Sequence, residues 1–337
     1  MGRYEYSLER RGTEGEAAAS ATPAVSVVLP TFNRARLLRQ AIDSVLALDE
    51  TPFELIVVDD GSTDATRSEL KALRDPRLSV IELSTNSGAN AARNAGIAAA
   101  RAPYVAFLDS DDTYLPGRLR SPLKILERHA HIGMVLSAFT TEKAAKTTVF
   151  SMPQRFYAGH EMRRLVARRV IQPTTSGLTI RRDILLAAGG FDPTLMRMQD
   201  SDLAMRIAQR TMAATIAEPL WHKRWQSDGI SSRRDTYFPA LLALIARHDI
   251  YQHEELDTRD YLLARHLVVL AKVLRFGQLR HDYNLALERL TPPPPPLRQL
   301  ISKYRSVRSN RHQLRERLLL AEPMTEIGEA PPLEVAP

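Results

Sequence analysis

The sequence lacks cysteine altogether, and none of its apolar runs approaches the roughly 20 residues that a membrane-spanning helix needs. Without cysteine the chain can form no disulfide, no cysteine-ligated zinc site and no catalytic thiol. Residues 1–23 lack the apolar core of a signal peptide, and their polar, alanine-rich composition predicts a disordered tail. These absences favour a cytoplasmic protein, and any membrane contact is expected to be peripheral, at the inner face.

The two signs of charge are not balanced. The 337 residues include 46 Lys and Arg against 39 Asp and Glu, a formal net charge of +7. Such an excess suits an anionic ligand, an acidic glycan, a lipid head group or nucleic acid, and it does not choose among them. The chain shows no nucleic-acid recognition motif and no repeat of alternating aromatic and basic residues, so we expect no nucleic-acid partner.

Short apolar, β-branched runs alternate with helical patterns along the first half of the chain. The expected strands are residues 25–29, 53–58, 78–83 and 104–108, with further strands near 177–180 and 213–216. Helices are expected after Asn33, which can cap the first of them, and over 89–100 and 202–210. Strands that alternate with helices pair in parallel. The fold class is therefore α/β, a three-layer α/β/α sandwich around a mainly parallel sheet.

The sequence divides into four parts. A tail over residues 1–23 is followed by an α/β domain over 24–234 and a helical extension over 235–320. Within the extension, five consecutive prolines at 292–296 predict a stiff spacer, because polyproline has an extended, preformed backbone. Residues 321–337 are expected to form a second disordered tail.

Polar residues directly follow three of the expected strands. They are Thr31 to Arg34, Asp59 to Asp64, and Asp109 to Asp112. Ligands of open α/β sheets bind at the carboxyl ends of the strands. These three segments therefore predict one common binding site.

The segment Asp109-Ser110-Asp111-Asp112 is the candidate metal site. Alternate carboxylates at the end of a strand can point the same way and share a hard divalent cation. A cation there would neutralise a diphosphate leaving group. The alternative is a turn or capping cluster, in which aspartate is common.

Other polar residues can be interpreted either as functional or as structural. Asp59 and Asp60 can accept hydrogen bonds from a nucleotide base or a ribose. Arg93 can face a diphosphate, or it can tie its helix to the acidic loops. Asp200 precedes an amphipathic helix and is either a general base or an N-cap, with Asp202 as the other candidate for each role.

Five sequence segments occur in one order across residues 25–210. They are VSVVLPTFNR, ELIVVDDGSTD, NSGANAARNAG, YVAFLDSDDTYLPGRL and GGFDPTLMRMQDSDLAMRI. In this order and spacing they resemble glycosyltransferase family 2, a family of inverting enzymes with the GT-A fold. The resemblance implies that residues 24–234 are a GT-A catalytic domain that takes a nucleotide-sugar donor.

The resemblance implies a role for each matching residue. Pro30, Phe32 and Asp60 should hold the nucleotide base, with Phe32 stacked on uracil. Asp109 and Asp111 should hold Mg²⁺ or Mn²⁺, with Asp111 as the direct ligand. The full set expected around the nucleotide-sugar is Pro30, Thr31, Phe32, Asn33, Arg34, Asp59, Asp60, Arg93, Asp109 and Ser110.

The same resemblance assigns catalysis to Asp200. It matches the aspartate of the family's Glu-Asp pair, although Gln199 stands here in place of the glutamate. Residues 221–231 resemble a segment that closes over the donor. His222 in that segment is a further candidate ligand for the metal or the diphosphate, and a solvated surface histidine is the alternative.

The implied reaction is metal-dependent, inverting transfer of a sugar from a donor expected to be UDP-linked. The acceptor would be a hydroxyl of a glycan or a lipid-linked glycan. Processive synthases of the family carry a QxxRW motif and transmembrane helices, whereas Arg224-Trp225 lacks that glutamine, so we expect transfer of single sugars. The alternatives are a nucleotidyltransferase on a similar sheet, which would release pyrophosphate, and a non-catalytic glycan-binding scaffold.

Residues 297–320 combine an apolar stripe with a basic face. Seven Lys and Arg stand here against one acid, Glu316. This pattern suits an interfacial helix on anionic lipid. The alternative is that the stripe packs on the catalytic domain or on a second copy of the chain, since most amphipathic helices face a core. The apolar residues at helical spacing are Leu297, Leu300, Ile301, Tyr304, Val307, Leu314 and Leu318.

Overall fold

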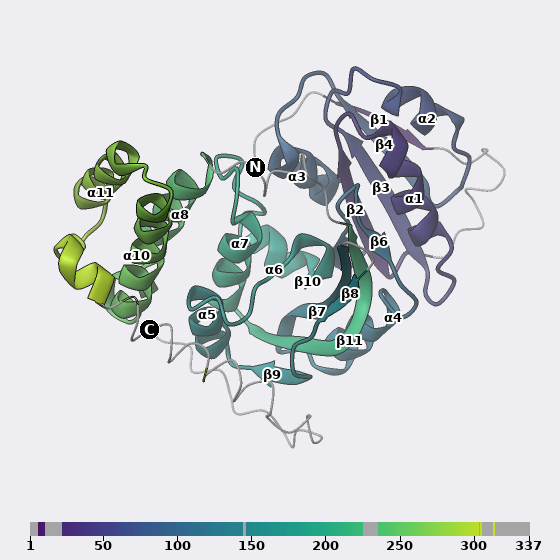
Figure 1. Cartoon of the computed structure of the whole chain (residues 1–337). Coiled ribbons are helices and arrows are strands. Elements are labelled where there is room, and N and C mark those ends of the chain that lie inside the picture. The colour runs from purple at the N-terminus through teal and green to yellow at the C-terminus, as the bar shows by residue number, and fades with distance from the viewer. Residues whose placement is uncertain are drawn as a thin grey trace.

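The computed structural model describes residues 6–10, 22–143, 146–224, 235–302, 304 and 313. A large β-sheet with helices on both faces forms its centre, and a group of further helices lies at one side (Figure 1). The strands are β1 (Tyr6–Arg10), β2 (Val25–Thr31), β3 (Phe53–Asp59), β4 (Leu78–Leu83), β5 (Tyr104–Phe107), β6 (Thr113–Tyr114), β7 (Ile132–Lys143), β8 (Lys146–Phe150), β9 (Arg155–Tyr157), β10 (Leu178–Arg181) and β11 (Met212–Arg224). The helices are α1 (Ala35–Leu46), α2 (Thr66–Ala72), α3 (Ala89–Ala99), α4 (Arg120–Arg128), α5 (Gly159–Ala167), α6 (Arg182–Ala187), α7 (Gln199–Ala208), α8 (Tyr237–Arg247), α9 (Ile250–His253), α10 (Leu256–Lys272) and α11 (Phe276–Arg289).

The strands lie in the order β1-β4-β3-β2-β5-β10-β7-β11-β6, with β8 on β7 and β9 on β11. The strands β4, β3, β2 and β5 are parallel to one another, as the alternation of strands and helices predicts. Beyond β5 the pairs are antiparallel, except that β11 is parallel to β7. The sheet is therefore mixed rather than mainly parallel, because β10 lies between β5 and β7 and runs opposite to both.

The first strand corrects the expectation of a tail over residues 1–23. Tyr6–Arg10 form β1, an edge strand antiparallel to β4, with Leu8 opposite Ile81. Apolar and polar residues alternate in this segment, and β4 offers it the unpaired backbone groups of a sheet edge. Composition alone misses such a strand. Residues 1–5 and 11–21 of the expected tail, and all of 321–337, lie outside the described residues.

Successive residues of the central strands pack into opposite layers. In β2, Val27 and Leu29 belong to the core that includes residues of α1 and α4, whereas Val28 belongs to the core that includes residues of α3, α5 and α7. Both faces of these strands are buried, which explains why they read as continuous apolar runs. The α/β fold with helices on both faces of a central sheet is thereby confirmed (Figure 1).

The helical extension packs on the α/β domain through α8. Phe238, Leu241 and Ile245 of α8 are buried in the same core as α5 and α7. The helices α10 and α11 lie beyond α8, on the side away from the sheet (Figure 1). No helix in the described part of the chain is long and apolar enough to cross a bilayer.

The proline run at 292–296 lies against this extension. Arg259 donates a hydrogen bond to the carbonyl of Pro292 at 2.7 Å, and the Tyr283 hydroxyl donates one to the carbonyl of Pro295 at 3.2 Å. Residues 297–302 continue as helix, and Leu300 is buried on α10. This first part of the expected arm therefore packs on the protein, and most of its remaining residues lie outside the described ranges.

Candidate functional site

The carboxyl ends of three adjacent strands, β3, β2 and β5, place the predicted polar segments along one edge of the sheet. Thr31 at the end of β2 is in register with Asp59 at the end of β3. Asp109 follows β5, which pairs with β2 on its other side. The prediction that these segments meet at one edge is confirmed by the strand order.

Asn33 joins the loops that follow β2 and β3. Its side-chain oxygen accepts the backbone N–H groups of Thr63 at 2.8 Å and Asp64 at 3.3 Å, and its own N–H donates to the Ser62 hydroxyl at 2.9 Å. The expectation that Asn33 caps the first helix is wrong. The N-cap of α1 is Arg34, and Asn33 has a positive φ of 51°, which asparagine tolerates better than most residues.

Asp59 and Asp60 are buried and bind neighbouring loops. Asp59 accepts the N–H of Ser62 at 3.2 Å and pairs with Arg67 at 3.2 Å. The two oxygens of Asp60 accept the backbone N–H groups that open the next loop, those of Ser87 at 2.7 Å and Gly88 at 2.8 Å. Burial raises the pKa of Asp60, although these two hydrogen bonds oppose the rise. Both acids therefore hold the loops at the carboxyl end of β3 in place.

Gly61 lets these loops approach closely. Its φ is +74°, and a Cβ added there would lie 2.8 Å from the backbone nitrogen of Asn86. A side chain at this position would strain the backbone and push the two loops apart.

Arg93 connects α3 to the acidic segment. Its guanidinium donates to a carboxylate oxygen of Asp109 at 2.7 Å and to the Asn90 side chain at 2.9 Å, and it lies over the Phe191 ring at 5.2 Å. The Nε of Arg93 is buried without a partner among the described residues. The structural interpretation of Arg93, as a tie between its helix and the acidic loops, is therefore confirmed by the geometry.

The Asp109–Asp112 segment concentrates negative charge. Burial, with a further contribution from Asp109, raises the pKa of Asp111, while Arg34 and Lys223 oppose the rise. Asp112 is buried, and burial followed by repulsion from Asp109 and Asp111 raises its pKa well above the ordinary value. A cation in this corner would relieve that repulsion.

Ser176 and β11 hold this corner in place. The Ser176 hydroxyl donates to Asp112 at 2.6 Å and accepts the N–H of Asp109 at 3.1 Å. Asp112 also accepts the N–H of Arg224, at the end of β11, at 3.3 Å. Sequence reasoning missed Ser176, because it comes from a segment far along the chain that only tertiary packing brings here. Lys223 lies within the segment 221–231 that the sequence placed near the donor, but the sequence alone predicts no role for it.

Asp200 lies in the first turn of α7. Its pKa is raised by burial and by Asp109, and lowered by Lys223 and Arg93, so these charges share one neighbourhood. The N-cap of α7 is Met198, so the alternative that Asp200 is the cap is wrong. Its carboxylate accepts only the adjacent N–H of Ser201, at 2.9 Å, in the recorded contacts of the described chain.

Asp202 has a different environment. It is fully buried, with Arg206 at 2.6 Å and His248 of the α8–α9 connection at 3.0 Å. Burial would raise its pKa, but the hydrogen bonds from His248 and Arg206 outweigh this effect and lower it. Asp202 therefore joins α7 to the helical extension and is no candidate base.

His222 on β11 stands opposite Thr113 of β6, next to the acidic corner. Its Nδ1 lies 3.0 Å from the Thr140 hydroxyl, and the ring is partly buried, so it is not a solvated surface histidine. Most of the segment expected to close over the donor, 225–231, lies outside the described residues. Within the described ranges, no three His, Asp or Glu side chains are grouped so that they could hold a metal ion by themselves.

Known proteins with similar sequences are glycosyltransferases and polysaccharide biosynthesis proteins. Residues 26–186 match the family model described as glycosyl transferase family 2. The succinoglycan biosynthesis protein ExoO of Rhizobium meliloti is 45% identical over 111 residues, 33% of this chain and 31% of that protein. The chain spans between 18% and 56% of the length of seven relatives that it matches.

Solved structures with the same fold cover most of the chain. TarS 1-349 of S. aureus, solved in complex with UDP-GlcNAc, has a TM-score of 0.67 at 19% identity and covers 86% of this chain and 91% of that chain. The mannosyltransferase PcManGT from Pyrobaculum calidifontis, solved with GDP-Man and Mn²⁺, has a TM-score of 0.55 at 19% identity and covers 89% and 86%. At these identities the likeness establishes the GT-A type of fold.

Proposed function

The chain belongs to glycosyl transferase family 2 through residues 26–186, and we propose that it transfers a single sugar, with inversion, from a nucleotide diphosphate donor to an acceptor hydroxyl. The observation that carries the proposal is the shared electrostatic neighbourhood of Asp109, Asp111 and Asp200, together with Arg93 and Lys223. Carboxylates for a metal and for a base, beside cations for a diphosphate, are the groups that this transfer needs.

The nucleotide is proposed to lie over the ends of β2 and β3. The Phe32 ring is 40% exposed, so it can stack on a base without rearrangement. The buried Thr31 hydroxyl has no hydrogen-bond partner in the described part of the chain, and a ligand hydroxyl would satisfy it. Pro30, Asn33, Asp59 and Asp60 shape this surface, and each oxygen of Asp60 keeps a second lone pair for the ligand.

A UDP-linked donor is the proposed substrate. The complex of TarS with UDP-GlcNAc supports this choice. Because PcManGT was solved with GDP-Man, a GDP-linked sugar is the alternative donor to test first. Arg34, which lowers the pKa of Asp111 and hence lies near it, and Ser110 are proposed to contact the diphosphate.

Asp111 and Asp109 are proposed to hold a divalent cation, Mg²⁺ or Mn²⁺. Asp109 already gives one oxygen to Arg93, so Asp111 is the better direct ligand. The raised pKa of Asp111 fits this role, because a cation would remove the cost of its buried charge. Bound there, the cation would neutralise charge on the leaving diphosphate. The Mn²⁺ in PcManGT supports this assignment.

His222 is proposed to complete the diphosphate site. Its contact with Thr140 uses Nδ1 and leaves Nε2 for a phosphate oxygen or the cation. Because no group of three suitable side chains is found in the described ranges, the diphosphate itself must provide several of the cation's ligands in this arrangement.

Asp200 is the proposed catalytic base. It would take the proton of the acceptor hydroxyl as that oxygen bonds to the anomeric carbon and the bond from this carbon to the diphosphate oxygen breaks. Its raised pKa strengthens it as a base, and Arg93 and Lys223 keep the carboxylate form accessible. The same two cations would stabilise negative charge that develops on the diphosphate.

The acceptor is proposed to be a glycan or a lipid-linked glycan of polysaccharide biosynthesis, modified at the cytoplasmic face of a membrane. The role of ExoO in succinoglycan biosynthesis supports this proposal.

Product analysis tests the function. We expect a UDP-sugar to be cleaved to UDP in the presence of Mn²⁺ and an acceptor, and NMR of the product to show the inverted anomeric configuration. Release of pyrophosphate would instead establish a nucleotidyltransferase. Binding of glycans without turnover of any nucleotide-sugar, in a panel that includes GDP-mannose, would establish a non-catalytic scaffold.

A further inference from the structure

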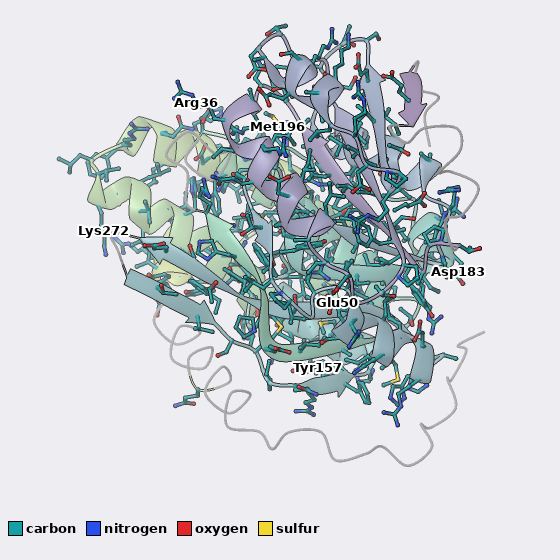
Figure 2. The ribbon with its side chains drawn as sticks, turned by 90° about the vertical axis from the view of Figure 1, so that its right-hand side faces the viewer. Arg36, Glu50, Tyr157, Asp183, Met196 and Lys272 are labelled. Carbon is teal, nitrogen blue, oxygen red and sulfur yellow. The ribbon has the colours of Figure 1, made fainter. Side chains whose placement is uncertain are left out.

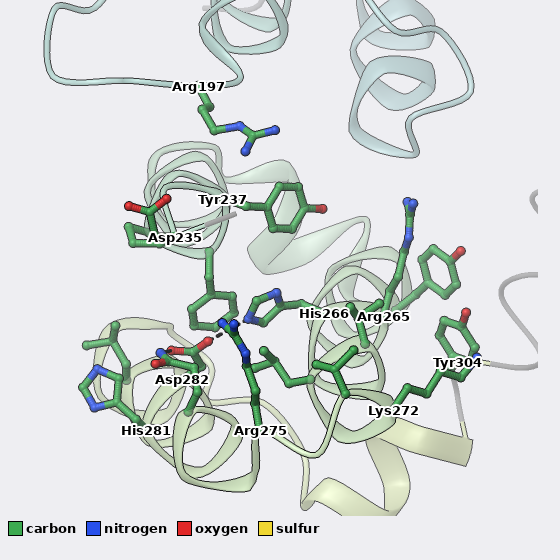
Figure 3. Close-up of a pocket in the computed structure, with 18 of the residues that line it drawn as sticks. Arg197, Asp235, Tyr237, Arg265, His266, Lys272, Arg275, His281, Asp282 and Tyr304 are labelled. Carbon is green, nitrogen blue, oxygen red and sulfur yellow. Dashed lines mark hydrogen bonds and ion pairs between the residues drawn. The ribbon is translucent and has the colours of Figure 1, made fainter. Parts of the chain in front are cut away.

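A cavity of about 1180 Å³ lies between the helical extension and the α/β domain (Figure 3). The helices α8, α10 and α11 supply most of its lining, and the α/β domain contributes residues that include Arg169 and Arg197. Arg197 reaches across from the α/β domain toward Tyr237 of α8, with its guanidinium 5.5 Å from the centre of that ring (Figure 3). None of the donor or metal residues proposed above lines this cavity.

Among the charged residues of the lining, cations outnumber anions. Asp282 accepts a hydrogen bond from Gln278 at 2.6 Å and lies 2.7 Å from Nε2 of His266, so both of its carboxylate oxygens have partners. Arg265 and Lys272 are exposed cations of α10, and Arg275 is an exposed cation just before α11. Lys272 lies on the side of the molecule that the extension forms (Figure 2). The charged residues are Arg169, Arg197, Arg265, Lys272 and Arg275 against Asp235 and Asp282.

Three of these cations have room for a ligand. Among the described residues, the side chains of Arg265, Lys272 and Arg275 make no hydrogen bond and no ion pair. Two arginines and a lysine around one cavity suit a doubly or triply charged oxyanion, because a guanidinium binds phosphate oxygens in a fork and an ammonium adds a mobile charge.

Exposed apolar side chains border the same cations. Val269 and Val273 line the cavity and are 49% and 48% exposed, and Leu274 and Phe276, at the turn between α10 and α11, are 75% and 59% exposed. Leu274 has a φ of +57°, a conformation that glycine usually adopts at the end of a helix. An exposed leucine in a strained turn, beside three other exposed apolar residues, indicates a surface with a ligand.

Two arginines that line the cavity connect it to the start of the helix that carries the proposed base. Arg197 precedes Asp200 by three residues, and a nitrogen of Arg169 lies 3.8 Å from the sulfur of Met198, the N-cap of the helix that carries Asp200. A ligand in the cavity would therefore approach the site from the start of α7. This approach is distinct from the edge formed by the ends of β2, β3 and β5, where the donor is proposed to lie.

We propose that this cavity binds the diphosphate of a lipid-linked acceptor. The diphosphate contacts Arg265, Lys272 and Arg275, the hydrocarbon chain lies against the apolar side chains at the α10–α11 turn, and the saccharide points toward Asp200. The proposal rests on the proposed function, because it names the acceptor of that reaction. A phosphate within a soluble glycan has the same charge, so the test must separate the diphosphate from the hydrocarbon.

Calorimetric titration of the full chain with pyrophosphate, farnesyl diphosphate and farnesol makes this separation. Saturating UDP and Mn²⁺ are present throughout, so that the donor site is filled. We expect farnesyl diphosphate to bind more tightly than pyrophosphate and far more tightly than farnesol, and its affinity to fall with added salt. Competition of pyrophosphate with UDP for one site would overturn the proposal, as would equal binding of farnesol and farnesyl diphosphate.

Two double variants divide the site. In Arg265→Gln/Arg275→Gln, the affinity for both diphosphates should fall by about tenfold or more, since charge-assisted hydrogen bonds are lost. In Leu274→Ser/Phe276→Ser, the preference for farnesyl diphosphate over pyrophosphate should disappear. The matched control is Arg280→Gln/Arg289→Gln, which removes two exposed arginines of α11 that do not line the cavity.

The outcomes are separable from those of the proposed function. Wild-type affinity in Arg265→Gln/Arg275→Gln, with unfolding curves that match wild type, overturns the site. An unchanged preference in Leu274→Ser/Phe276→Ser overturns the lipid source. If the wild type fails to bind UDP in a separate titration, the proposed donor is wrong. The titration of wild type and variants with farnesyl diphosphate, without UDP, then tests the cavity by itself.

Discussion

The guanidinium of Arg93 donates a hydrogen bond to a carboxylate oxygen of Asp109 at 2.7 Å, at the corner where β5 ends. Arg93 is 5% exposed and Asp109 is 34% exposed, so the pair lies at the boundary between the core and the site. Through this contact α3 fixes one acid of the proposed metal site. The positive charge of Arg93 also lowers the pKa of Asp200, on a different element.

Arg93→Gln should therefore change the pH dependence of transfer. Without the guanidinium, the pKa of Asp200 rises, and a base with a higher pKa becomes protonated at a higher pH. The acid limb of the pH–rate profile should move toward higher pH, as steady-state rates across a pH series would reveal. Arg101→Gln removes a cation of the Glu54 pair and serves as the control. An unmoved acid limb in Arg93→Gln would contradict the coupling.

Asp111→Asn should abolish metal-dependent binding of UDP while the fold survives. The substitution removes the direct ligand, and it also removes a carboxylate whose burial raises its pKa, so the stability should not fall. Calorimetric titration with UDP, with and without Mn²⁺, measures the effect. The control is Asp183→Asn, an exposed acid at the start of α6. If Mn²⁺ strengthens UDP binding equally in Asp111→Asn and wild type, Asp111 is not the ligand.

Asp200→Asn should separate binding from chemistry. The amide is nearly the same size but cannot accept the proton, so transfer should fall by about 10²-fold or more while the affinity for the donor persists. A single-turnover experiment measures the rate of transfer, and a titration of the same preparation measures the affinity for the donor. Near-normal turnover would exclude Asp200 as the base.

Asp202→Asn changes an acid two residues from Asp200, and it should lower the stability of the fold rather than act directly on the transfer step. This acid pairs with Arg206 and His248, so its loss should lower the free energy of unfolding by about 3 kcal/mol at neutral pH. The folded-state pKa of Asp202 is lowered, so its stabilising contribution is present above the unfolded-state pKa and is lost as the pH falls through the folded-state pKa. Urea unfolding at neutral and acid pH should show that the difference in the free energy of unfolding between wild type and Asp202→Asn becomes smaller in acid. A constant gap argues against this role.

Gly61→Ala should destabilise the edge of the sheet. The added Cβ would lie 2.8 Å from a backbone nitrogen, at a φ of +74°, so both the contact and the backbone conformation oppose it. We expect a loss of about 1–3 kcal/mol in the free energy of unfolding, measured by urea denaturation. Gly277→Ala is the control, because nothing lies within 4 Å of its Cβ and alanine favours the helix. Equal unfolding midpoints for the two variants would refute the steric argument.

Local patterns were enough to predict the elements that carry the site. The apolar runs of β2, β3 and β5 are buried on both faces. Such strands can be recognised in the sequence as continuous apolar runs, because every residue in them faces a core. The acids that follow those runs, Asp59 and Asp109, stand at one edge because parallel strands end on the same side. Asn33, in contrast, does not cap α1 as its sequence position predicts, because its partners Thr63 and Asp64 are about 30 residues away in the chain.

The amino-acid sequence by itself determined the family resemblance, the alternation of strands and helices, and which acids stand at strand ends, because these depend on residue order within short segments. Only the tertiary structure decided that β10 runs antiparallel between β5 and β7, that Tyr6–Arg10 pair with β4, and that Lys223 and Ser176 reach the acidic corner. It also decided that Arg265, Lys272 and Arg275 line one cavity with Arg197. Such arrangements arise from contacts between distant segments, whose pairing is selected by packing and charge in the whole chain and leaves no periodic trace in any one segment.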